Sequence, residues 1–344
     1  MGSAAAGDRV RFWLSDPGEA VIDVRVWLDL EHHVDPPAMR RTSGRWAVEI
    51  ARPPVQRVEY LYLLTYADGS GSKMCDPDNP VRVPTAFGAH SVLEFAGYTA
   101  PGWLTGEFEP GRTTALMVRA LELRRPLPIT IWSPADCPAG AALPILLVHD
   151  GPEFERLASV TRFAAAMIGS GRLPAHRVAL LGPGDRDRWY AASPAYARAL
   201  RGLGLPAVRD AAAVRGSVAL AGASLGALAA LHAAVTQPGT ASALFLQSGS
   251  FFRPDLDAQE RSFGGFAAVT EFVASLDRSA PLRIAMTCGL AEENLANNRL
   301  MARRLAELGH AVTYGEVPDA HTHVGWRDAF DPYLVDLLAA AWLP

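Results

Sequence analysis

The segment VALAGASLGALAALHAAV, residues Val218 to Val235, decides the fold. It opens with an apolar run that predicts a buried strand and ends with a run of strong helix formers. Between them lies Gly222-Ala-Ser-Leu-Gly226, a match to G-x-S-x-G. A strand that turns sharply into a helix at this pattern forms a nucleophile elbow, which needs small residues beside the serine. The segment therefore predicts Ser224 as a nucleophile in an α/β-hydrolase fold, with the Leu225 N–H as an oxyanion-hole donor.

The chain around this segment alternates between strand and helix patterns. We expect strands at 115–123, 127–132, 143–149, 177–181, 217–221, 242–246, 282–287 and 311–317, and helices at 156–168, 194–203, 206–214, 227–235, 294–308 and 326–342. Repeated alternation of this kind is typical of a mainly parallel sheet with helices on both faces. It predicts an α/β catalytic domain over residues 115–344.

The first hundred residues have a different pattern. Short runs rich in β-branched and aromatic residues alternate with turn signals such as Asp35-Pro-Pro37 and Asp68-Gly69. The expected strands are 10–14, 21–30, 45–50 and 58–66, followed by a rigid turn at 76–80. This pattern predicts an antiparallel β-sandwich domain at 1–100. A segment with Pro101 and Gly102 then predicts a linker at 101–114.

A serine nucleophile needs a histidine base, and the base needs a carboxylate that orients it. In this fold the chain order is serine, acid, histidine. The histidines after Ser224 are His232, His310, His321 and His323. We expect a packed or surface position for His232, which falls within the helix after the elbow, and a surface position for His310. His321 and His323 both follow the last expected strand, and their spacing does not choose between them.

The acid is expected in the loop after strand 282–287. Glu292 and Glu293 are the candidates there, and one of them is expected to cap the following helix instead. Asp319 is a weaker alternative, because it lies so close to His321 along the chain.

Composition excludes several other classes of protein. The formal net charge of −4, with 49% hydrophobic and 20% charged residues, gives no reason to expect binding to nucleic acid or to an anionic membrane. Cys75, Cys137 and Cys288 form no CxxC or Cys/His pattern, so we expect buried reduced thiols and no metal site. Residues 1–11 lack a basic segment followed by an apolar one, and a soluble cytoplasmic protein is expected. The mechanism requires no cofactor, and the oligomeric state is not determined.

Several further phrases occur in an order seen in one known family. They are His149-Asp-Gly151, Arg186 through Tyr196, Gln247-Ser-Gly-Ser-Phe251, Cys288 through Glu292, and His321 five residues before Trp326-Arg327. With these phrases, residues 143–342 resemble the enterochelin esterase family, siderophore esterases related to feruloyl esterases and mycolyltransferases. The resemblance implies an Ig-like or early-set fold for the N-terminal sandwich. It also implies His321, rather than His323, as the base and Glu292, rather than Glu293, as the acid.

The same resemblance suggests the rest of the site. A backbone amide near Gly151 would be the second oxyanion donor, although Pro152 has no N–H, so that Gly151, Glu153 or a shifted loop must provide it. Residues placed to bind substrate, with core packing as the alternative for the aromatic ones, are Arg186, Trp189, Tyr190, Phe251 and Trp326.

The function expected from these residues is a serine carboxylesterase. It would hydrolyse a small-molecule ester or lactone, with an aromatic acyl part by resemblance, through an acyl-serine intermediate. Acyl transfer to an alcohol by the same triad, a serine peptidase and a non-catalytic carbohydrate-binding protein are the alternatives.

Overall fold

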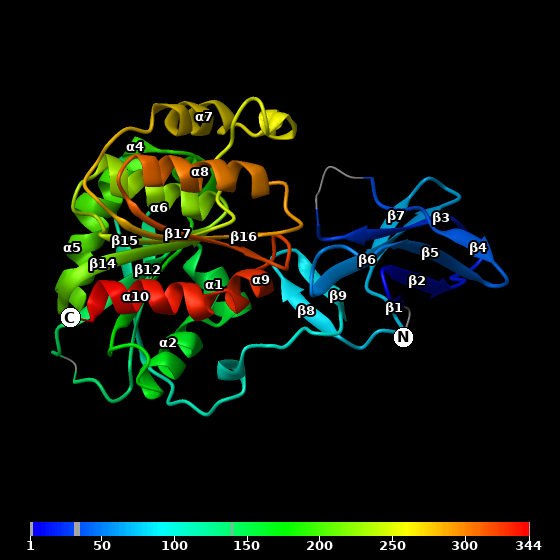
Figure 1. Ribbon diagram of the computed structural model, residues 1–344, viewed down its shortest axis with the longest axis horizontal. Helices are drawn as coiled ribbons and strands as arrows, with labels where there is room; N and C mark the ends of the chain where they lie inside the picture. The colour runs from blue at the N-terminus through cyan, green and yellow to red at the C-terminus, as the bar shows by residue number, and fades with distance from the viewer. Residues whose placement is uncertain (1–2, 31–34, 139, 344) are drawn as a thin grey trace. The chain divides into compact units, whose positions relative to one another are not determined.

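The computed structural model describes residues 3–30, 35–138 and 140–343, and it divides into two compact units (Figure 1). The first unit comprises Met1–Thr99 together with the short segments Gly289–Glu293 and Pro318–Gly325. The second comprises Ala100–Cys288, Asn294–Val317 and Trp326–Pro344. The two short segments are the loops expected to carry the acid and the base. The expected domain boundaries at 1–100, 101–114 and 115–344 stay a prediction.

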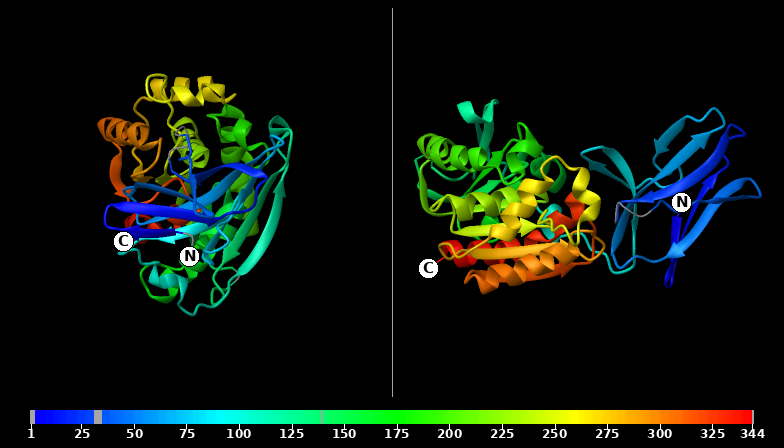
Figure 2. Two further views of the ribbon diagram at one scale, coloured as in Figure 1. Left: turned by 90° about the vertical axis from the view of Figure 1, so that its right-hand side faces the viewer. Right: turned by 90° about the horizontal axis from the view of Figure 1, so that it is seen from above.

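The first unit is built from two antiparallel sheets, seen from two further directions in Figure 2. One has the strand order β1-β2-β5-β4 and the other β3-β6-β9-β8, with β7 paired to β6. The strands are β1 (Ser3–Ala6), β2 (Arg9–Ser15), β3 (Val21–Leu28), β4 (Arg40–Thr42), β5 (Arg45–Ala51), β6 (Arg57–Tyr66), β7 (Gly71–Met74), β8 (Arg82–Thr85) and β9 (Gly88–Glu94). The expected β-sandwich is confirmed.

Alternation along the strands forms the core of this unit. In β2 the buried side chains are Val10, Phe12 and Leu14, because successive residues of a strand point to opposite faces. The expected turn at 76–80 is also present, and the Asp78 N–H donates to Asp76 Oδ1 at 2.9 Å. Strands β1, β4, β7, β8 and β9 were not predicted, because they are short or largely polar.

The second unit contains an eight-stranded sheet with the order β10-β11-β13-β12-β14-β15-β16-β17. The pairs from β13 through β12, β14 and β15 to β16 are parallel, and β10 and β11 add antiparallel pairs at one edge. The strands are β10 (Arg112–Val118), β11 (Leu127–Ser133), β12 (Leu143–Val148), β13 (Arg177–Leu181), β14 (Val214–Ala223), β15 (Ala243–Gln247), β16 (Arg283–Gly289) and β17 (Ala311–Val317). This sheet has the α/β architecture that the sequence predicts.

Helices cover both faces of this sheet (Figure 1). One hydrophobic cluster joins the sheet to α4, α6 and α8, and a second joins it to α1, α2 and α10. The helices are α1 (Gly151–Ala158), α2 (Val160–Gly169), α3 (Arg186–Tyr190), α4 (Pro194–Ala199), α5 (Leu205–Ala211), α6 (Leu225–Thr236), α7 (Phe266–Ser275), α8 (Leu295–Glu307), α9 (His323–Asp328) and α10 (Val335–Trp342). Short turns and π segments are η1 (Gly102–Leu104), η2 (Leu121–Leu123), η3 (Leu200–Gly204), η4 (Ala258–Ser262) and η5 (Phe330–Leu334).

Several expected elements are shifted or broken in the structure. The helix expected at 156–168 is interrupted at Ser159, where φ is 51°, and Glu155 accepts the Thr161 N–H at 3.0 Å at the start of α2. The helix expected at 326–342 breaks before Pro332, because a proline disfavours helical geometry in the residue that precedes it. At the edge of the sheet, the strand expected at 115–123 lies at β10, so that the expected linker at 101–114 includes its first residues.

Two further differences concern helices. The expected helix at 206–214 ends at Ala211, and β14 begins already at Val214, since this β-branched residue pairs with Leu143. Helix α7 was not predicted. Among the described residues, none of the helices combines the length and the apolar composition needed to cross a bilayer.

Candidate active site

Ser224 lies in a sharp turn between β14 and α6, in the second unit. Its backbone has φ 55° and ψ −127°, a conformation that L-residues rarely adopt and that costs about 1–3 kcal/mol. Strain of this kind persists only when the surrounding structure enforces it. Here the Ser224 N–H donates to the carbonyl of Gln247 in the neighbouring strand at 2.9 Å. The turn has the form of a nucleophile elbow.

Two glycines permit the turn because the backbone passes so close to them. A Cβ atom at Gly222 would lie 2.5 Å from the backbone carbon and oxygen of Gly226. A Cβ at Gly226 would lie 3.2 Å from the Cβ of His149, on the end of β12. Close packing therefore excludes a side chain at Gly222 and leaves little room for one at Gly226.

The hydroxyl of Ser224 has a partner that the sequence analysis did not identify. Its Oγ lies 3.2 Å from the Oγ of Ser250, and the Ser250 N–H donates to the Ser224 carbonyl at 3.2 Å. Ser250 follows β15, within the phrase Gln247 to Phe251 on which the family resemblance rests. The signal was therefore present, but nothing in the sequence indicated which of its residues would contact Ser224.

The two expected oxyanion donors each begin a helix. Leu225 is the first residue of α6 and Gly151 is the first residue of α1, so that the helix itself offers neither N–H an acceptor. A Cβ atom at Gly151 would lie 2.4 Å from the Cα of Leu180, which leaves room only for glycine. The residue before it, Asp150, is left-handed with φ 51°.

Arg186, expected to bind substrate, forms an ion pair with Asp150. Its Nη2 lies 2.8 Å from Asp150 Oδ2, and its Nε lies 2.9 Å from Oδ1. Burial disfavours the charged guanidinium, but the Asp150 carboxylate outweighs this and raises the pKa of Arg186. The guanidinium therefore holds the left-handed residue next to Gly151.

The aromatic residues expected to bind substrate are enclosed by protein. Trp189, Tyr190 and Phe251 are between 0% and 1% exposed, and packing, the alternative given for them, is what the structure describes. Trp326 is also buried, and its Nε1–H donates to Ser248 Oγ at 2.9 Å. Their large apolar surface stabilises the packing around α3, α9 and the segment after β15, and a role in substrate binding stays a prediction.

His321 and Glu292 form a close pair in the first unit. His321 Nδ1 lies 2.8 Å from Glu292 Oε2, and the Gly289 N–H donates to Glu292 Oε1 at 2.7 Å. The carboxylate favours the tautomer with the proton on Nδ1, which leaves Nε2 as the basic nitrogen. The Glu292 side chain is 1% exposed and that of His321 is 20% exposed, so the imidazole is the accessible partner.

The electrostatic surroundings of His321 favour its charged form. Burial disfavours the imidazolium, but the Glu292 carboxylate, its hydrogen bond, and the charges of Asp29 and Glu293 outweigh it. The pKa of His321 therefore lies above its ordinary value of 6.5. A base with a raised pKa accepts a proton more readily, and its imidazolium is stabilised when it forms.

The other candidates are occupied elsewhere. Asp319, the weaker alternative acid, accepts the Ala320 N–H at 2.7 Å and lies 3.7 Å from the Arg57 guanidinium. His310 was expected at the surface, but it is buried and its Nδ1 accepts the Leu282 N–H at 3.2 Å. His232 is packed against Phe272, and burial lowers its pKa to about 4.

The cysteines differ in their burial. Cys288 is buried as expected, whereas Cys75 and Cys137 are partly exposed. Within the described ranges, one group has the residue types of a metal site, namely Asp29, Glu59 and His90, with one atom of each within 4.8 Å of the others. Glu59 already uses one oxygen for Arg57 and lies 3.3 Å from His90 through the other, so these side chains are already partners of one another.

Residues 121–337 match the model of a family described as "Putative esterase". The chain belongs to this esterase family. No curated protein matches the chain.

Solved structures share the fold of this family member. An enterobactin esterase from Shigella flexneri, determined in the presence of 2,3-dihydroxy-N-benzoyl-glycine, is 21% identical, with a TM-score of 0.75 over 98% of this chain and 96% of its own. A ferulic acid esterase is 16% identical, with a TM-score of 0.56 over 67% and 97%. A fluorophosphonate-binding serine hydrolase from Staphylococcus aureus is 15% identical, with a TM-score of 0.51 over 67% and 99%. The expected resemblance to enterochelin esterases is confirmed in fold over nearly the whole chain.

Proposed function

We propose that this esterase-family member is a serine carboxylesterase in which Ser224, His321 and Glu292 form the catalytic triad. The observation that carries the proposal is the strained turn at Ser224, with φ 55° between a strand and a helix. The contact of 2.8 Å between His321 and Glu292 supports it, because a triad base needs a carboxylate on its second nitrogen. The order serine, acid, histidine along β14, β16 and β17 supports it as well.

In the first step, His321 Nε2 takes the proton of Ser224 Oγ while that oxygen attacks the ester carbonyl carbon. The carbonyl π bond opens, and the resulting oxyanion accepts hydrogen bonds from the Leu225 N–H and, as second donor, the Gly151 N–H. The bond to the leaving alcohol then breaks, and His321 returns the proton to that oxygen. Glu292 stabilises the imidazolium between the two transfers.

In the second step, water replaces the alcohol. His321 takes a proton from the water, whose oxygen attacks the acyl-serine carbonyl, and the proton then returns to Ser224 Oγ. The products are a carboxylic acid and the free enzyme. An alcohol acceptor in place of water would give acyl transfer with the same residues.

The substrate class that we propose is an ester or lactone with an aromatic acyl group. The solved structures similar to this chain support this choice, because their descriptions name enterobactin, a dihydroxybenzoyl compound and ferulic acid. A panel of matched aryl-acid and alkyl-acid esters tests it. Faster turnover of alkyl-acid esters, or a new ester formed when an alcohol is added, would contradict the proposed substrate or the hydrolytic reaction.

The experiment that tests the mechanism is labelling with a fluorophosphonate, a reagent that phosphonylates activated serines. We expect labelling of the wild type at Ser224 and none of Ser224→Ala or His321→Ala. Two variants serve as matched controls, Ser217→Ala on the same strand and His323→Ala two residues from the base, and both should label like the wild type. Label mapped to another serine, or full labelling of folded Ser224→Ala, would reject the assignment.

A further inference from the structure

The first unit contains a buried arginine at the start of β6. Arg57 is 2% exposed, and its Nη2 lies 2.9 Å from Oε1 of Glu59, which is 3% exposed. Burial disfavours both charges. The hydrogen bond with His90 and the charge of Arg57 outweigh it for Glu59, whose pKa is lowered, and the charges of Asp319 and Glu59 outweigh it for Arg57, whose pKa is raised. A buried charge is retained in a protein only where it is paired in this way.

The same guanidinium also contacts the segment that carries His321. Arg57 Nη1 donates to Thr322 Oγ1 at 3.4 Å and lies 3.7 Å from Asp319 Oδ2. These two partners flank His321 on both sides along the chain. The Arg57 side chain therefore contacts this segment both before and after His321.

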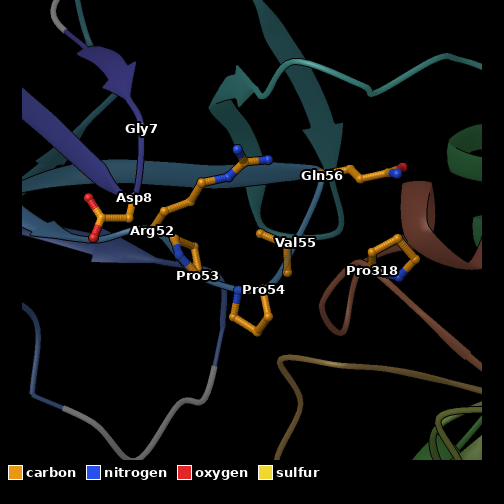
Figure 3. A pocket seen from close by; sticks show the side chains of 8 residues that line it. All are labelled: Gly7, Asp8, Arg52, Pro53, Pro54, Val55, Gln56 and Pro318. Carbon is orange, nitrogen blue, oxygen red and sulfur yellow. The ribbon is translucent and has the colours of Figure 1, made fainter.

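Further contacts hold the ends of this segment. The Gln56 N–H, next to Arg57, donates to the Pro318 carbonyl at 2.7 Å, and Figure 3 shows both residues lining one pocket of this unit. Within the segment, the Gly325 N–H donates to Thr322 Oγ1 at 3.0 Å. Substitution of Arg57 would therefore keep the hydrogen bond between Gln56 and Pro318 and remove the contacts with Asp319 and Thr322.

We infer that Arg57 is a positioning residue for His321. It holds the segment Asp319–Thr322 in place, so that the imidazole keeps its contact with Glu292. The inference rests on the proposed function of His321. Arginine suits this task because its planar fork binds several acceptors in fixed directions, whereas lysine offers a single flexible charge. A displacement of about 1 Å at a catalytic group can cost about 100-fold in rate, even when the substitution lies away from the reacting atoms.

The test compares Arg57→Gln, Arg57→Lys, Asp319→Asn and the double variant Arg57→Gln/Asp319→Asn, with Arg9→Gln as control. Arg9 forms an exposed ion pair with Glu49 in the same unit, at 3.0 Å. We expect Arg57→Gln to lower kcat on an aryl ester by about 100-fold, with KM little changed. Arg57→Lys should keep an intermediate kcat, and the double variant should lose no more than the larger single loss, because both changes break one contact.

A second measurement does not depend on ester turnover. Amide hydrogen exchange of residues 320–325 should be faster in Arg57→Gln and Asp319→Asn than in the wild type, and unchanged in Arg9→Gln. If Arg57→Gln does not fold, Asp319→Asn still decides, since it leaves the Arg57–Glu59 pair in place. Unchanged exchange and unchanged kcat in a folded variant would overturn the inference. Faster exchange in a chain whose wild type turns over no ester would instead reject the proposed function.

Discussion

The turn that carries Ser224 and the segment that carries His321 are held in different ways. The turn around Ser224 is shaped by its own neighbours, because Gly222 and Gly226 let the backbone close on itself. The segment around His321 is gripped by Arg57, whose contact with Thr322 joins residues 265 positions apart. A steric requirement between neighbouring residues produces a short sequence pattern that can be recognised. A contact between residues far apart in the chain produces no such pattern. Ser224 is therefore much easier to recognise in the sequence than His321 and Glu292, the other two members of the proposed triad.

The strain at Ser224 can be separated from its chemistry. Ser224→Ala and Ser224→Gly should each lower kcat by about 10⁴–10⁶-fold, because both remove the proposed nucleophile. Only glycine relieves the positive φ, so we expect Ser224→Gly to be more stable than Ser224→Ala by about 1 kcal/mol. Urea unfolding of the two variants measures the difference. Equal stabilities would mean that the turn stores no strain.

The support of His321 by its carboxylate should show in both rate and pH dependence. Glu292→Gln removes the charge that raises the pKa of His321, and kcat should fall by about 10³–10⁴-fold. The base must be neutral, so kcat/KM rises as pH rises through that pKa. The acid limb of the pH profile of kcat/KM should therefore move to lower pH much further in Glu292→Gln than in Glu293→Gln, because Glu293 contributes only the last-ranked of the charges that favour the imidazolium. An acid limb that moves equally in the two variants would mean that neither Glu292 nor Glu293 is the specific partner of His321.

The close packing of the elbow predicts an effect on stability. Gly222→Ala would place a methyl group 2.5 Å from the backbone of Gly226, and we expect a loss of about 1–3 kcal/mol in the free energy of unfolding together with a fall in kcat. Gly202→Ala is the control, because a Cβ there has no neighbour within 4 Å among the described residues. Urea unfolding that shows equal stability for the two variants would contradict the steric account of the elbow.

The smallest effect concerns Asp29, whose charge favours the imidazolium form of His321. Burial and the charge of Glu59 raise the pKa of Asp29 to about 7. A carboxyl with a raised pKa contributes stability at low pH that is lost as pH rises through that value. The stability of Asp29→Asn relative to the wild type should thus increase between about pH 4 and 7.

The acid limb of Asp29→Asn should also shift slightly to lower pH, because one charge that favours the imidazolium is gone. Parallel pH–stability and pH–rate measurements on the wild type and Asp29→Asn test both effects. A stability difference that does not change with pH would mean that Asp29 has an ordinary pKa.

Sequence patterns predicted the architecture and the elbow because both depend on local periodicity and on glycine. Alternation identified the sandwich, and the apolar runs identified most strands of the large sheet. The helix break at Ser159 was missed because it depends on a left-handed residue that nothing in its sequence requires. The burial of Trp189 and Tyr190 in the short helix α3 could not be predicted, because an aromatic residue carries no sign in the sequence of whether it faces inward.

The grouping of the His321 and Glu292 segments with the N-terminal strands also had no local signal. Arg57 and Glu59 look like ordinary charged residues of a half-exposed strand, and only the three-dimensional contacts reveal a buried pair. Ser250 was missed for the same reason, since its contact with Ser224 crosses from one strand end to the next.

The contacts of Arg57 have a consequence for protein engineering. A fragment beginning near residue 100 would retain the turn at Ser224 but lose Arg57, which contacts Asp319 and Thr322. Exchanging the N-terminal residues for those of another esterase would likewise separate Arg57 from the segment that carries His321. A unit exchanged in this chain should therefore be discontinuous. It should combine the N-terminal strands with the segments Gly289–Glu293 and Pro318–Gly325.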